Sequence, residues 1–534
     1  MALIKCFNCG KEISDRNKFC SNCGTSIEDI KKTIIQEKKI DKKYVQKHFK
    51  DVKEVVIPNW AIEITKGAFE GCEDLVSVNI ADSVREIGES AFKNCKKLEN
   101  VKLPEGLLKI NDFTFDSCSS LKRIEIPNSV ISIGRDAFLH CCFETLELPE
   151  ALLEIDVGAF SSCENLKEVA ISDSVVRIGR SAFHGCNSLE TVKLSKNLIN
   201  IEGNTFCNCK SLKSIEIPDG VVEIGPQAFY GCSSIKKLYI PKSVVKIDAN
   251  SSLDYPFPFA NCSSLEEIVV EPNNLFYHSI DNCIIEKSTK TLILGCKNSI
   301  IPKYIKKING AFCGCESLIK IGIPYGVNEI GKFAFAGCIS LESIEVPETI
   351  KKIGKDAFYG CGKLNQLAVP NSVKEIGHGA FAFCKSIKNI NIPEGITEIK
   401  MSLFRGCTSL ETIDIPHTVK TIKEFAFNGC TSLNTVNMSN SITLIEQFAF
   451  LGCASLINIK LPKYLQRIKA RSFGDCILLK NITIPKTTSM VASCTFGGCA
   501  NLTIYCEIDK KPPYWNKDWN PDNRPVIWGC DAEN

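Results

Sequence analysis

Apolar and polar positions follow a long period along most of the chain. A unit of about 23 residues recurs with the pattern I-G-x-x-A-F-x-G-C-x-x-L-x-x-I-x-I-P-x-x-V-x-x, as between Ile353 and Val373. Its L-x-x-I-x-I segment alternates apolar and polar residues, which predicts a short strand with every second side chain directed inward. Proline then removes a backbone donor where the chain must turn. The glycine after isoleucine suits a bend into the A-F segment, which predicts one helical turn or an irregular segment.

The recurrence of this unit predicts a solenoid, because one unit is too small to bury its own apolar side and must stack on its neighbours. We expect a curved solenoid of about 19 or 20 rungs with parallel short strands, spanning residues 52–502. A phenylalanine lies three residues before most of the recurring cysteines, from Phe69 to Phe496. The recurring cysteines are Cys72, Cys95, Cys118, Cys141, Cys163, Cys186, Cys209, Cys232, Cys262, Cys315, Cys338, Cys361, Cys384, Cys407, Cys430, Cys453, Cys476 and Cys499.

The repeat resembles the BspA-like class of leucine-rich repeats. The resemblance is carried by segments such as Leu341-x-x-Ile344-x-Val346-Pro347 and Ile353-Gly354-x-x-Ala357-Phe358-x-x-Cys361. It implies a leucine-rich-repeat solenoid that binds other macromolecules through an exposed sheet. Many members of this class are similar to surface adhesins, so an adhesin exported without a signal peptide is one alternative function.

The period breaks between Cys232 and Cys315, and we assign an irregular insert to residues 248–307. Asp248 to Pro258 predicts a loop, and the segment through Ile280-Asp-Asn-Cys283 to Thr291-Leu-Ile-Leu294 predicts a variant rung with a hairpin. Insertions in solenoids often carry binding loops. The insert is either such a specificity loop or simply an irregular rung.

Two C-x-x-C-G elements, Cys6-Phe-Asn-Cys9-Gly10 and Cys20-Ser-Asn-Cys23-Gly24, lie near the N-terminus. A C-x-x-C turn directs two thiolates at one point, and glycine permits the positive φ of such a tight turn. Two of these turns predict tetrahedral ligation of one Zn²⁺ by Cys6, Cys9, Cys20 and Cys23. Four thiolates leave no open position, so the site is expected to be structural. Iron accepts the same ligands and is the chemical alternative.

This segment resembles the short zinc ribbons found at the N-termini of many bacterial proteins, and we assign residues 1–25 to it. Zinc ribbons bind either proteins or nucleic acids. Residues 26–51 follow as a basic helical connector and N-terminal cap, with Ile27, Ile30 and Ile34 at helical spacing. Residues 1–53 hold 13 Lys+Arg against 7 Asp+Glu, a net charge of +6. A nucleic-acid-associated regulator that acts through residues 1–50 is therefore a second alternative.

The predicted strands turn one column of side chains outward, and this column holds five acidic residues, three lysines and Tyr239 as its one aromatic residue. A nucleic-acid groove needs a basic track with stacking rings. The composition of this column therefore favours unknown protein partners, bound through the concave sheet. The outward residues are Asn79, Lys102, Glu125, Glu147, Ala170, Lys193, Glu216, Tyr239, Val269, Gly322, Glu345, Ala368, Asn391, Asp414, Asn437, Lys460 and Thr483.

The recurring cysteines predict a ladder of small buried side chains. Neighbouring rungs would hold the Cβ atoms about 4.8 Å apart, beyond the separation of about 3.5–4.5 Å that a disulfide requires. Residues 503–534 change composition and hold Trp515, Trp519 and Trp528. This tail is expected to cover the last rung as a C-terminal cap, since solenoid ends need such cover. An aromatic cluster that binds sugars or peptides is the alternative for the tail.

The remaining sequence features point away from catalysis and membranes. The 534 residues carry a net charge of +3, and no run of 18 apolar residues predicts a membrane span. A charge and a cysteine occur within the first six residues, so we expect no signal peptide and a cytoplasmic protein. The six histidines are scattered, and no phosphate-loop, serine-hydrolase or zinc-protease motif occurs. The sequence predicts a non-enzymatic protein–protein interaction scaffold with a structural zinc module.

Overall fold

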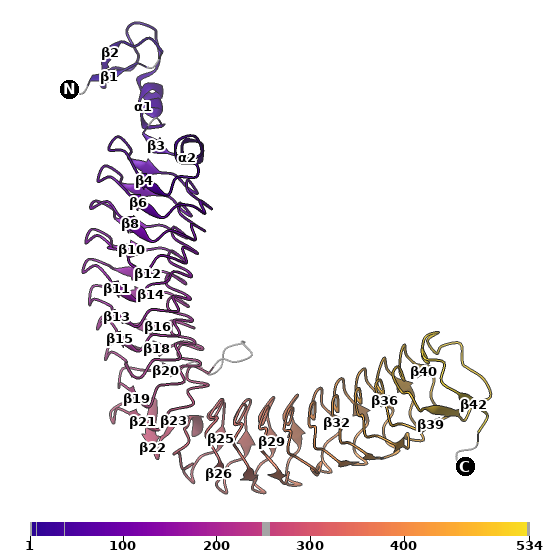
Figure 1. Cartoon of the computed structure of the whole chain (residues 1–534). Coiled ribbons are helices and arrows are strands. Elements are labelled where there is room, and N and C mark those ends of the chain that lie inside the picture. Colours follow the sequence, from indigo (N-terminus) through magenta and orange to yellow (C-terminus); the bar gives the residue numbers. More distant parts are fainter. Residues whose placement is uncertain (1–2, 7, 37, 248–256, 531–534) are drawn as a thin grey trace. The chain divides into compact units, whose positions relative to one another are not determined.

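The computed structural model describes residues 3–6, 8–36, 38–247 and 257–530. The chain forms two compact units, residues 1–232 and residues 233–534. Both consist of stacked rungs of short parallel strands (Figure 1). Within these described residues the rungs make about 21 turns, with almost no helix. This is slightly more than the 19 or 20 rungs expected, because strand pairing continues outward to residue 39 at one end and to residue 528 at the other.

Most rungs contribute a longer strand that corresponds to the L-x-x-I-x-I segment. In unit 1 these strands are β4 (Glu54–Val56), β6 (Ser77–Asn79), β8 (Asn100–Lys102), β11 (Thr145–Glu147), β13 (Glu168–Ala170), β15 (Thr191–Lys193) and β17 (Ile215–Glu216). In unit 2 they are β19 (Lys237–Ile240), β21 (Glu267–Val270), β26 (Lys320–Gly322), β28 (Ser343–Glu345), β30 (Gln366–Leu367), β33 (Thr412–Ile415), β35 (Thr435–Met438), β37 (Asn458–Ile459), β39 (Asn481–Ile484) and β41 (Thr503–Cys506). The pairing is parallel and in register with the repeat, so that Val55 lies beside Val78 and Val78 beside Val101.

A second strand of two residues, which the sequence pattern did not predict, ends at the first isoleucine of the repeat pattern in most rungs. In unit 1 these strands are β3 (Lys39–Ile40), β5 (Glu63–Ile64), β7 (Glu86–Ile87), β9 (Lys109–Ile110), β10 (Ser132–Ile133), β12 (Glu154–Ile155), β14 (Arg177–Ile178), β16 (Asn200–Ile201) and β18 (Glu223–Ile224). In unit 2 they are β20 (Lys246–Ile247), β25 (Lys307–Ile308), β27 (Glu329–Ile330), β29 (Lys352–Ile353), β31 (Glu375–Ile376), β32 (Glu398–Ile399), β34 (Thr421–Ile422), β36 (Leu444–Ile445), β38 (Arg467–Ile468) and β40 (Met490–Val491). Two residues are too few to show a period in sequence, so only the stacking of rungs reveals this column.

The glycine that follows the second strand is needed for close approach between rungs rather than for a bend. A Cβ atom on Gly88 would lie 2.5 Å from the backbone nitrogen of Lys66, and one on Gly179 would lie 2.6 Å from that of Val157. Neither distance is tolerated by a real side chain, so at these two rungs the preceding rung can lie this close only against glycine.

The A-F segment is a stack of tight turns, so of the two forms expected for it, a helical turn or an irregular segment, the structure has the irregular one. The backbone N–H groups of Gly67, Phe69 and Gly71 donate to carbonyls of the next rung at 2.9, 2.8 and 2.8 Å. Gly67 and Gly71 have φ values of 61° and 72°. Left-handed residues on both sides of the phenylalanine turn alternate N–H groups toward the next rung. The turn therefore bonds between rungs, whereas a helix would satisfy the same groups internally.

The core of each unit is a continuous stack of phenylalanine rings. Successive rings of the repeat, from Phe69 to Phe229 in unit 1 and from Phe312 to Phe496 in unit 2, lie 5.0–5.9 Å apart with planes within 15° of each other. Offset ring pairs of this kind add to the burial of apolar area. The stack confirms that the repeat forms a solenoid with a single-file core.

The ladder cysteines are small buried side chains, as expected, but they also act as hydrogen-bond donors. From the second rung onward, the Sγ of most ladder cysteines donates to the phenylalanine carbonyl of the preceding rung at 3.0–3.3 Å, as Cys95 does to Phe69. All 30 cysteines lie in the described part of the chain, and none of them forms a disulfide. The thiol therefore links rungs without a covalent bond.

The N-terminal segment begins with an antiparallel pair, β1 (Leu3–Lys5) and β2 (Glu12–Ser14). Helix α1 (Ile27–Gln36), strand β3 and helix α2 (Lys42–His48) follow. Strand β3 pairs with β5, so the solenoid pairing already starts within the segment assigned to the connector. Phe49, which ends α2, stacks on Phe69 of the first rung. The side chain of Ile34 lies outside the described residues.

Unit 2 contains the predicted hairpin, formed by β22 (Tyr277–Ile280) and β23 (Cys283–Glu286). Strand β24 (Thr291–Leu294) pairs antiparallel with β23 and parallel with β25, which returns the chain to the regular rungs. Most of the loop predicted from Asp248 to Pro258 lies outside the described residues. Among the described residues, no helix combines the length and the apolar character needed to cross a membrane.

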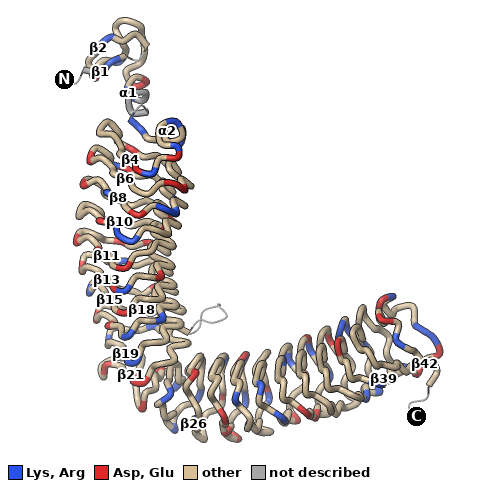
Figure 2. The backbone as a smooth tube through the Cα atoms, viewed as in Figure 1, with Lys and Arg blue, Asp and Glu red and all other residues tan. Residues whose placement is uncertain are grey.

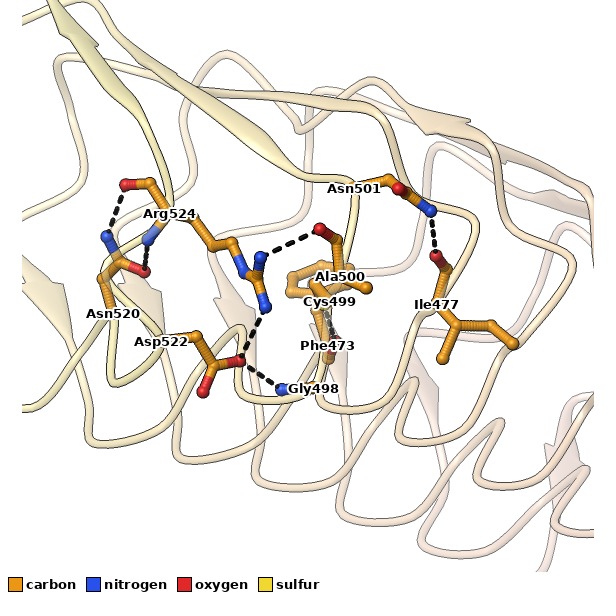
Figure 3. A network of polar contacts seen from close by, with 9 residues as sticks. All are labelled: Phe473, Ile477, Gly498, Cys499, Ala500, Asn501, Asn520, Asp522 and Arg524. Atoms are coloured by element: carbon orange, nitrogen blue, oxygen red, sulfur yellow. Dashed lines mark hydrogen bonds and ion pairs between the residues drawn. The ribbon is translucent and has the colours of Figure 1, made fainter.

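The tail covers the last rung of unit 2. Strand β42 (Val526–Trp528) pairs with β41, and Trp515 and Trp519 are buried in the core. Figure 3 shows how side chains replace the missing next rung: the Asp522 carboxylate accepts the Gly498 N–H at 2.7 Å, and Arg524 donates to the Ala500 carbonyl at 2.9 Å. These contacts satisfy backbone groups that would otherwise be exposed at the open end.

Candidate metal centre and binding surface

The two C-x-x-C-G elements fold into matching turns. In the first turn the Gly10 N–H donates to the Cys6 carbonyl at 2.8 Å, and in the second the Gly24 N–H donates to the Cys20 carbonyl at 2.9 Å. Gly10 and Gly24 have φ values of 74° and 75°, the left-handed conformation that glycine adopts without strain. The two glycines therefore allow the cysteines of each turn to point to the same side.

The structure brings the four cysteines together. The Sγ atoms of Cys6 and Cys23 lie 3.5 Å apart, those of Cys9 and Cys20 lie 3.6 Å apart, and all four lie within 4.8 Å of one another. Four sulfurs bonded at about 2.3 Å to a tetrahedral Zn²⁺ would be separated by about 3.8 Å. The donor set and its spacing therefore fit one such ion. Among the described residues, this is the one group of three or more cysteine, histidine or carboxylate side chains close enough to share a metal ion.

Hydrogen bonds favour the thiolate form at two of the four cysteines, Cys23 and Cys9. The Thr25 side chain lies 3.0 Å from Cys23 Sγ, and together with the Thr25 backbone N–H it lowers the pKa of Cys23 to about 6. The pKa of Cys9 is also lowered, chiefly by the backbone N–H of Lys11. Since the thiolate is the metal-binding form, these contacts prepare the site for a cation.

The N-terminal module has a very small apolar core. Its buried members are Cys6, Ile13, Cys20, Ile27 and Ile30. Two of the five are candidate ligands, so the apolar contact independent of them consists of three buried isoleucines and the partly buried Ile4. A core of this size does not support a stable fold without an added link such as a metal ion.

The outward column of the longer strands is exposed as the sequence predicted. All of its residues are exposed except Thr483, which is half-buried. Tyr239 and Val269 are its largest apolar members, at 44% and 38% exposure. Figure 2 shows lysine and arginine interspersed with acidic residues along the rungs of both units. The column therefore offers polar contacts of both charges, and hydrogen bonds between rungs hold the backbone that carries it.

A groove of about 550 Å³ interrupts this sheet in unit 2. It lies where no strand forms between β30 and β33, and the side chain of Asn391 takes over the pairing. The Asn391 amide oxygen accepts the Val369 N–H at 3.0 Å, and its amide nitrogen donates to the Val369 carbonyl. The polar residues that line the groove are Asn389, Asn391, Glu394, Thr412, Asp414 and His417.

Sequence reasoning placed Asn391 and Asp414 in the outward column but missed the groove. One signal in the sequence could have indicated the groove: asparagine is unfavourable in a strand, and its side chain can hydrogen-bond to backbone groups. His417 was set aside as one of six scattered histidines. In the structure its Nδ1 lies 2.9 Å from Glu394 at the edge of the groove. Asp414 is held by the Asn437 amide, which donates to it at 2.7 Å.

Comparisons with known families match both parts of the chain. The family model of the BspA type leucine-rich repeat region, which has six copies, matches residues 38–167, 153–290, 294–411 and 397–507. The model of the zinc-ribbon domain matches residues 5–27. No curated protein shows significant sequence similarity to the chain.

Solved structures with leucine-rich repeats are similar to the chain. A leucine-rich cell surface protein from Faecalibacterium prausnitzii A2-165 is 29% identical, with a TM-score of 0.45, 72% of this chain covered and 87% of that protein covered. A leucine-rich repeat protein from Eubacterium ventriosum is 22% identical, with a TM-score of 0.47 and coverages of 70% and 86%. The leucine-rich repeat protein of T. pallidum is 32% identical, with a TM-score of 0.27 and coverages of 34% and 78%.

The family models and the repeat geometry, rather than these overall superpositions, carry the assignment. The repeat models together span most of the rungs, and the four cysteines of the N-terminal module lie within the zinc-ribbon match. The chain therefore belongs to the BspA-type leucine-rich repeat family and carries an N-terminal zinc-ribbon domain.

Proposed function

We propose that the protein is a non-enzymatic protein–protein interaction scaffold that binds a partner through the longer-strand sheet of unit 2. The observation that carries this proposal is the polar groove at Asn391, which opens where the strand pairing of the exposed sheet is interrupted between β30 and β33. The rungs are rigid and present this groove without reordering. Binding of a partner therefore costs little conformational entropy of the scaffold. Asp414 and Glu394 favour a protein segment that brings a basic or amide side chain into the groove.

Affinity capture with three full-length proteins tests this proposal. The baits are the wild type, Asp414→Lys in the groove, and Glu348→Lys as a control with the same charge change outside the groove. A partner of this site is retained by the wild type and by the control but lost by Asp414→Lys. The purified partner is then titrated against all three, with at least a tenfold weaker Kd expected for Asp414→Lys. Equal binding by all three proteins would refute the assignment to the groove.

We further propose that Cys6, Cys9, Cys20 and Cys23 hold one structural Zn²⁺. The sulfur spacing and the small isoleucine core support this proposal. When bound, the metal supplies a cross-link between the two turns and leaves no position for a substrate. Elemental analysis of protein purified without added metal tests it, with one zinc per chain expected and none in Cys6→Ser/Cys9→Ser. Stoichiometric iron with the absorption of an iron–thiolate site would show the alternative metal.

A reducing compartment, such as the cytosol, is the location we propose for the scaffold. No ladder cysteine forms a disulfide, and most ladder thiols serve as hydrogen-bond donors, which oxidation would prevent. Thiol counting on protein denatured directly from cells tests this, with 30 free thiols expected after the metal is chelated. Display of the protein on the cell exterior with oxidised cysteines would favour the adhesin instead.

A further inference from the structure

A row of aromatic side chains with an arginine at its centre lies on the A-F turns of unit 2. Five consecutive rungs contribute one side chain each to this aromatic stripe: Tyr359, Phe383, Arg405, Phe425 and Phe448. The Tyr359 and Phe383 rings meet edge to face at 5.2 Å, and the Phe425 and Phe448 rings stack at 4.9 Å. Tyr359 and Arg405 are exposed, and the three phenylalanines are half-buried. The aromatic stripe is therefore a surface feature, distinct from the buried ring stack of the core.

Arg405 lies between two rings of the stripe. The central carbon of its guanidinium is 5.7 Å from the centre of the Phe383 ring and 5.6 Å from the centre of the Phe425 ring. Contacts of this kind hold a cation over ring faces without using its hydrogen-bond donors. Within the part of the chain that the structure describes, the Arg405 guanidinium forms no hydrogen bond and no ion pair. Its five N–H donors are therefore held in place and open to a ligand.

Unit 1 contains the same arrangement with an acidic partner built in. Lys93 occupies the position of Arg405 in its rung, lies 4.8 Å from the centre of the Phe113 ring, and forms an ion pair with Asp116 at 2.9 Å. In unit 2 the residue equivalent to Asp116 is Asn428, whose amide donates to the Leu451 carbonyl. The rung can therefore place a carboxylate beside such a cation, but unit 2 supplies an amide in its place.

The phenylalanines of the stripe occupy backbone positions that disfavour a bulky side chain. Phe383, Phe425 and Phe448 have φ values of 59°, 57° and 58°. In the rungs before and after Phe383, the same position is held by glycine, Gly360 and Gly406. A left-handed backbone is costly for a bulky L-residue, and clustered strain of this kind points to function. Folding of the rungs does not explain these rings, whereas a binding surface does.

The rings present their edges to the solvent. Phe425 has the Arg405 guanidinium over its face and also stacks on Phe448, so the exposed part of this ring is its edge. The edge of an aromatic ring carries the positive end of its quadrupole. A guanidinium matches a carboxylate through two parallel hydrogen bonds. Ring edges and guanidinium together therefore favour a carboxylate. A single-stranded nucleic acid would need open ring faces on which its bases could stack.

The charge around the stripe suits a short acidic segment. The stripe leads in the next rung to Arg471, which is exposed and whose guanidinium forms no hydrogen bond or ion pair among the described residues. From the rung of Tyr359 to that of Arg471, the six A-F turns, each counted from the residue after the isoleucine to the cysteine, hold six Lys or Arg and four Asp or Glu. This small positive excess is not the continuous basic track that a nucleic acid needs.

We propose that the aromatic stripe binds an acidic protein segment and that Arg405 holds one of its carboxylates through two hydrogen bonds. Apolar side chains next to this carboxylate contact the edges of Phe383 and Phe425. Arg471 lies three rungs from Arg405, about 14 Å along the stack, which an extended segment spans with about four residues. A second carboxylate at that spacing reaches Arg471. This site is formed by the turns, whereas the groove at Asn391 is formed by the longer strands, so the two sites can be tested separately.

Binding of a fluorescent peptide to the full-length protein tests the proposal. The end-capped peptide carries two glutamates four residues apart, with leucine and phenylalanine between them. By fluorescence anisotropy the wild type is expected to bind it with a Kd of about 100 μM or tighter. Arg405→Gln is expected to weaken this binding at least tenfold, and replacing both glutamates by glutamine should do the same.

Arg467→Gln is the matched control, because it removes an exposed arginine of unit 2 that belongs to a short strand and lies outside the stripe. It is expected to bind the peptide as the wild type does. A wild type that does not bind the peptide, or equal effects of Arg405→Gln and Arg467→Gln, would overturn the proposal. Tighter binding of single-stranded oligo-dT than of the peptide would overturn the choice of a protein segment.

Two further variants leave Arg405 in place. Asn428→Asp restores the carboxylate that Asp116 provides in unit 1, so Arg405 gains an internal partner and peptide binding is expected to weaken at least tenfold. Phe425→Asn removes one ring, and Asn204 shows in unit 1 that asparagine adopts the left-handed conformation at this position. It is expected to weaken binding at least threefold. Unchanged binding by Asn428→Asp would refute the role of Arg405. Unchanged binding by Phe425→Asn together with a lower urea midpoint would show that the ring only packs.

Discussion

The phenylalanine stack should make the loss of one central ring costly. Phe358 is fully buried and lies 5.4 Å from Phe335 and 5.8 Å from Phe381, with ring planes tilted by 9° and 15°. Truncating a buried phenylalanine to alanine costs about 3–5 kcal/mol of unfolding free energy, since the cavity relaxes only partly. Phe358→Leu keeps much of the apolar volume but loses both ring contacts, each worth about 0.5–1.5 kcal/mol. We therefore expect about 1–3 kcal/mol for this milder change.

Urea unfolding followed by tryptophan fluorescence measures this effect, because Trp515, Trp519 and Trp528 all belong to unit 2 with Phe358. The urea midpoint is expected to be highest for the wild type, lower for Phe358→Leu and lowest for Phe358→Ala. Lys363→Ala changes an exposed residue of the same rung and should stay within about 0.5 kcal/mol of the wild type. Amide exchange should accelerate first in the rungs that neighbour Phe358, since each rung is stabilised by its nearest neighbours.

If Phe358→Ala lowers the unfolding free energy by less than about 1 kcal/mol, the idea that both neighbouring rungs hold each ring is refuted. A buried cavity costs so little only if the rungs collapse onto it. Exchange that accelerates uniformly over the whole unit would contradict the nearest-neighbour coupling. Equal midpoints for Phe358→Leu and Phe358→Ala would show that ring contacts, rather than apolar volume, dominate the loss.

Three further predictions follow from the thiol ladder, the tail and the N-terminal module. Burial raises the pKa of Cys186 and Cys407 to about 12, above the value of about 8.5 in an unfolded chain, so their contribution is complete below pH 8.5 and is lost as the pH rises toward 12. The unfolding free energy obtained from urea titration should therefore fall as the pH rises above about 8.5, by up to about 1.4 kcal/mol per pH unit for each such thiol, and a value unchanged up to pH 10 would contradict the burial of these thiols. Asp522→Ala removes the acceptor of the Gly498 N–H and should cost about 1–3 kcal/mol locally, seen as faster exchange of that amide, while Lys517→Ala should leave it unchanged. Removal of the metal by a chelator should make residues 3–26 sensitive to protease without shifting the urea midpoint of the solenoid. If the urea midpoint also falls when the metal is removed, the zinc ribbon supports the first rung.

The repeat and the metal ligands could be predicted from the sequence because both leave local and recurrent signals. Phenylalanine three residues before cysteine, repeated along the chain, is sufficient to predict stacked rungs. Two C-x-x-C-G elements are sufficient to predict that Cys6, Cys9, Cys20 and Cys23 meet, since each turn is short and each glycine permits its conformation. Alternation in the longer strand likewise predicted which side chains face outward, from Asn79 to Lys460.

Other features depend on contacts between rungs and have no local signal. The two-residue strands exist because neighbouring backbones pair, and the thiol of each ladder cysteine finds its acceptor 26 residues earlier in most rungs. The glycine that follows isoleucine in some rungs was explained by a bend, whereas the structure assigns Gly88 and Gly179 to the close approach of the preceding rung. Phe383, Arg405 and Phe425 were visible in the sequence, but only stacking shows that the arginine lies between the two rings.

The sequence by itself determined the repeat, its inward and outward positions and the four clustered cysteines, because these depend on residue type and spacing within a single rung. Tertiary structure alone decided the ring stack, the thiol-to-carbonyl ladder, the groove at Asn391 and the side-chain contacts of Asp522 that close the last rung. The physical reason is that a rung has no stable structure alone. Its backbone groups and apolar side chains are satisfied by the rungs on either side, so the contacts that define it join residues one full repeat apart.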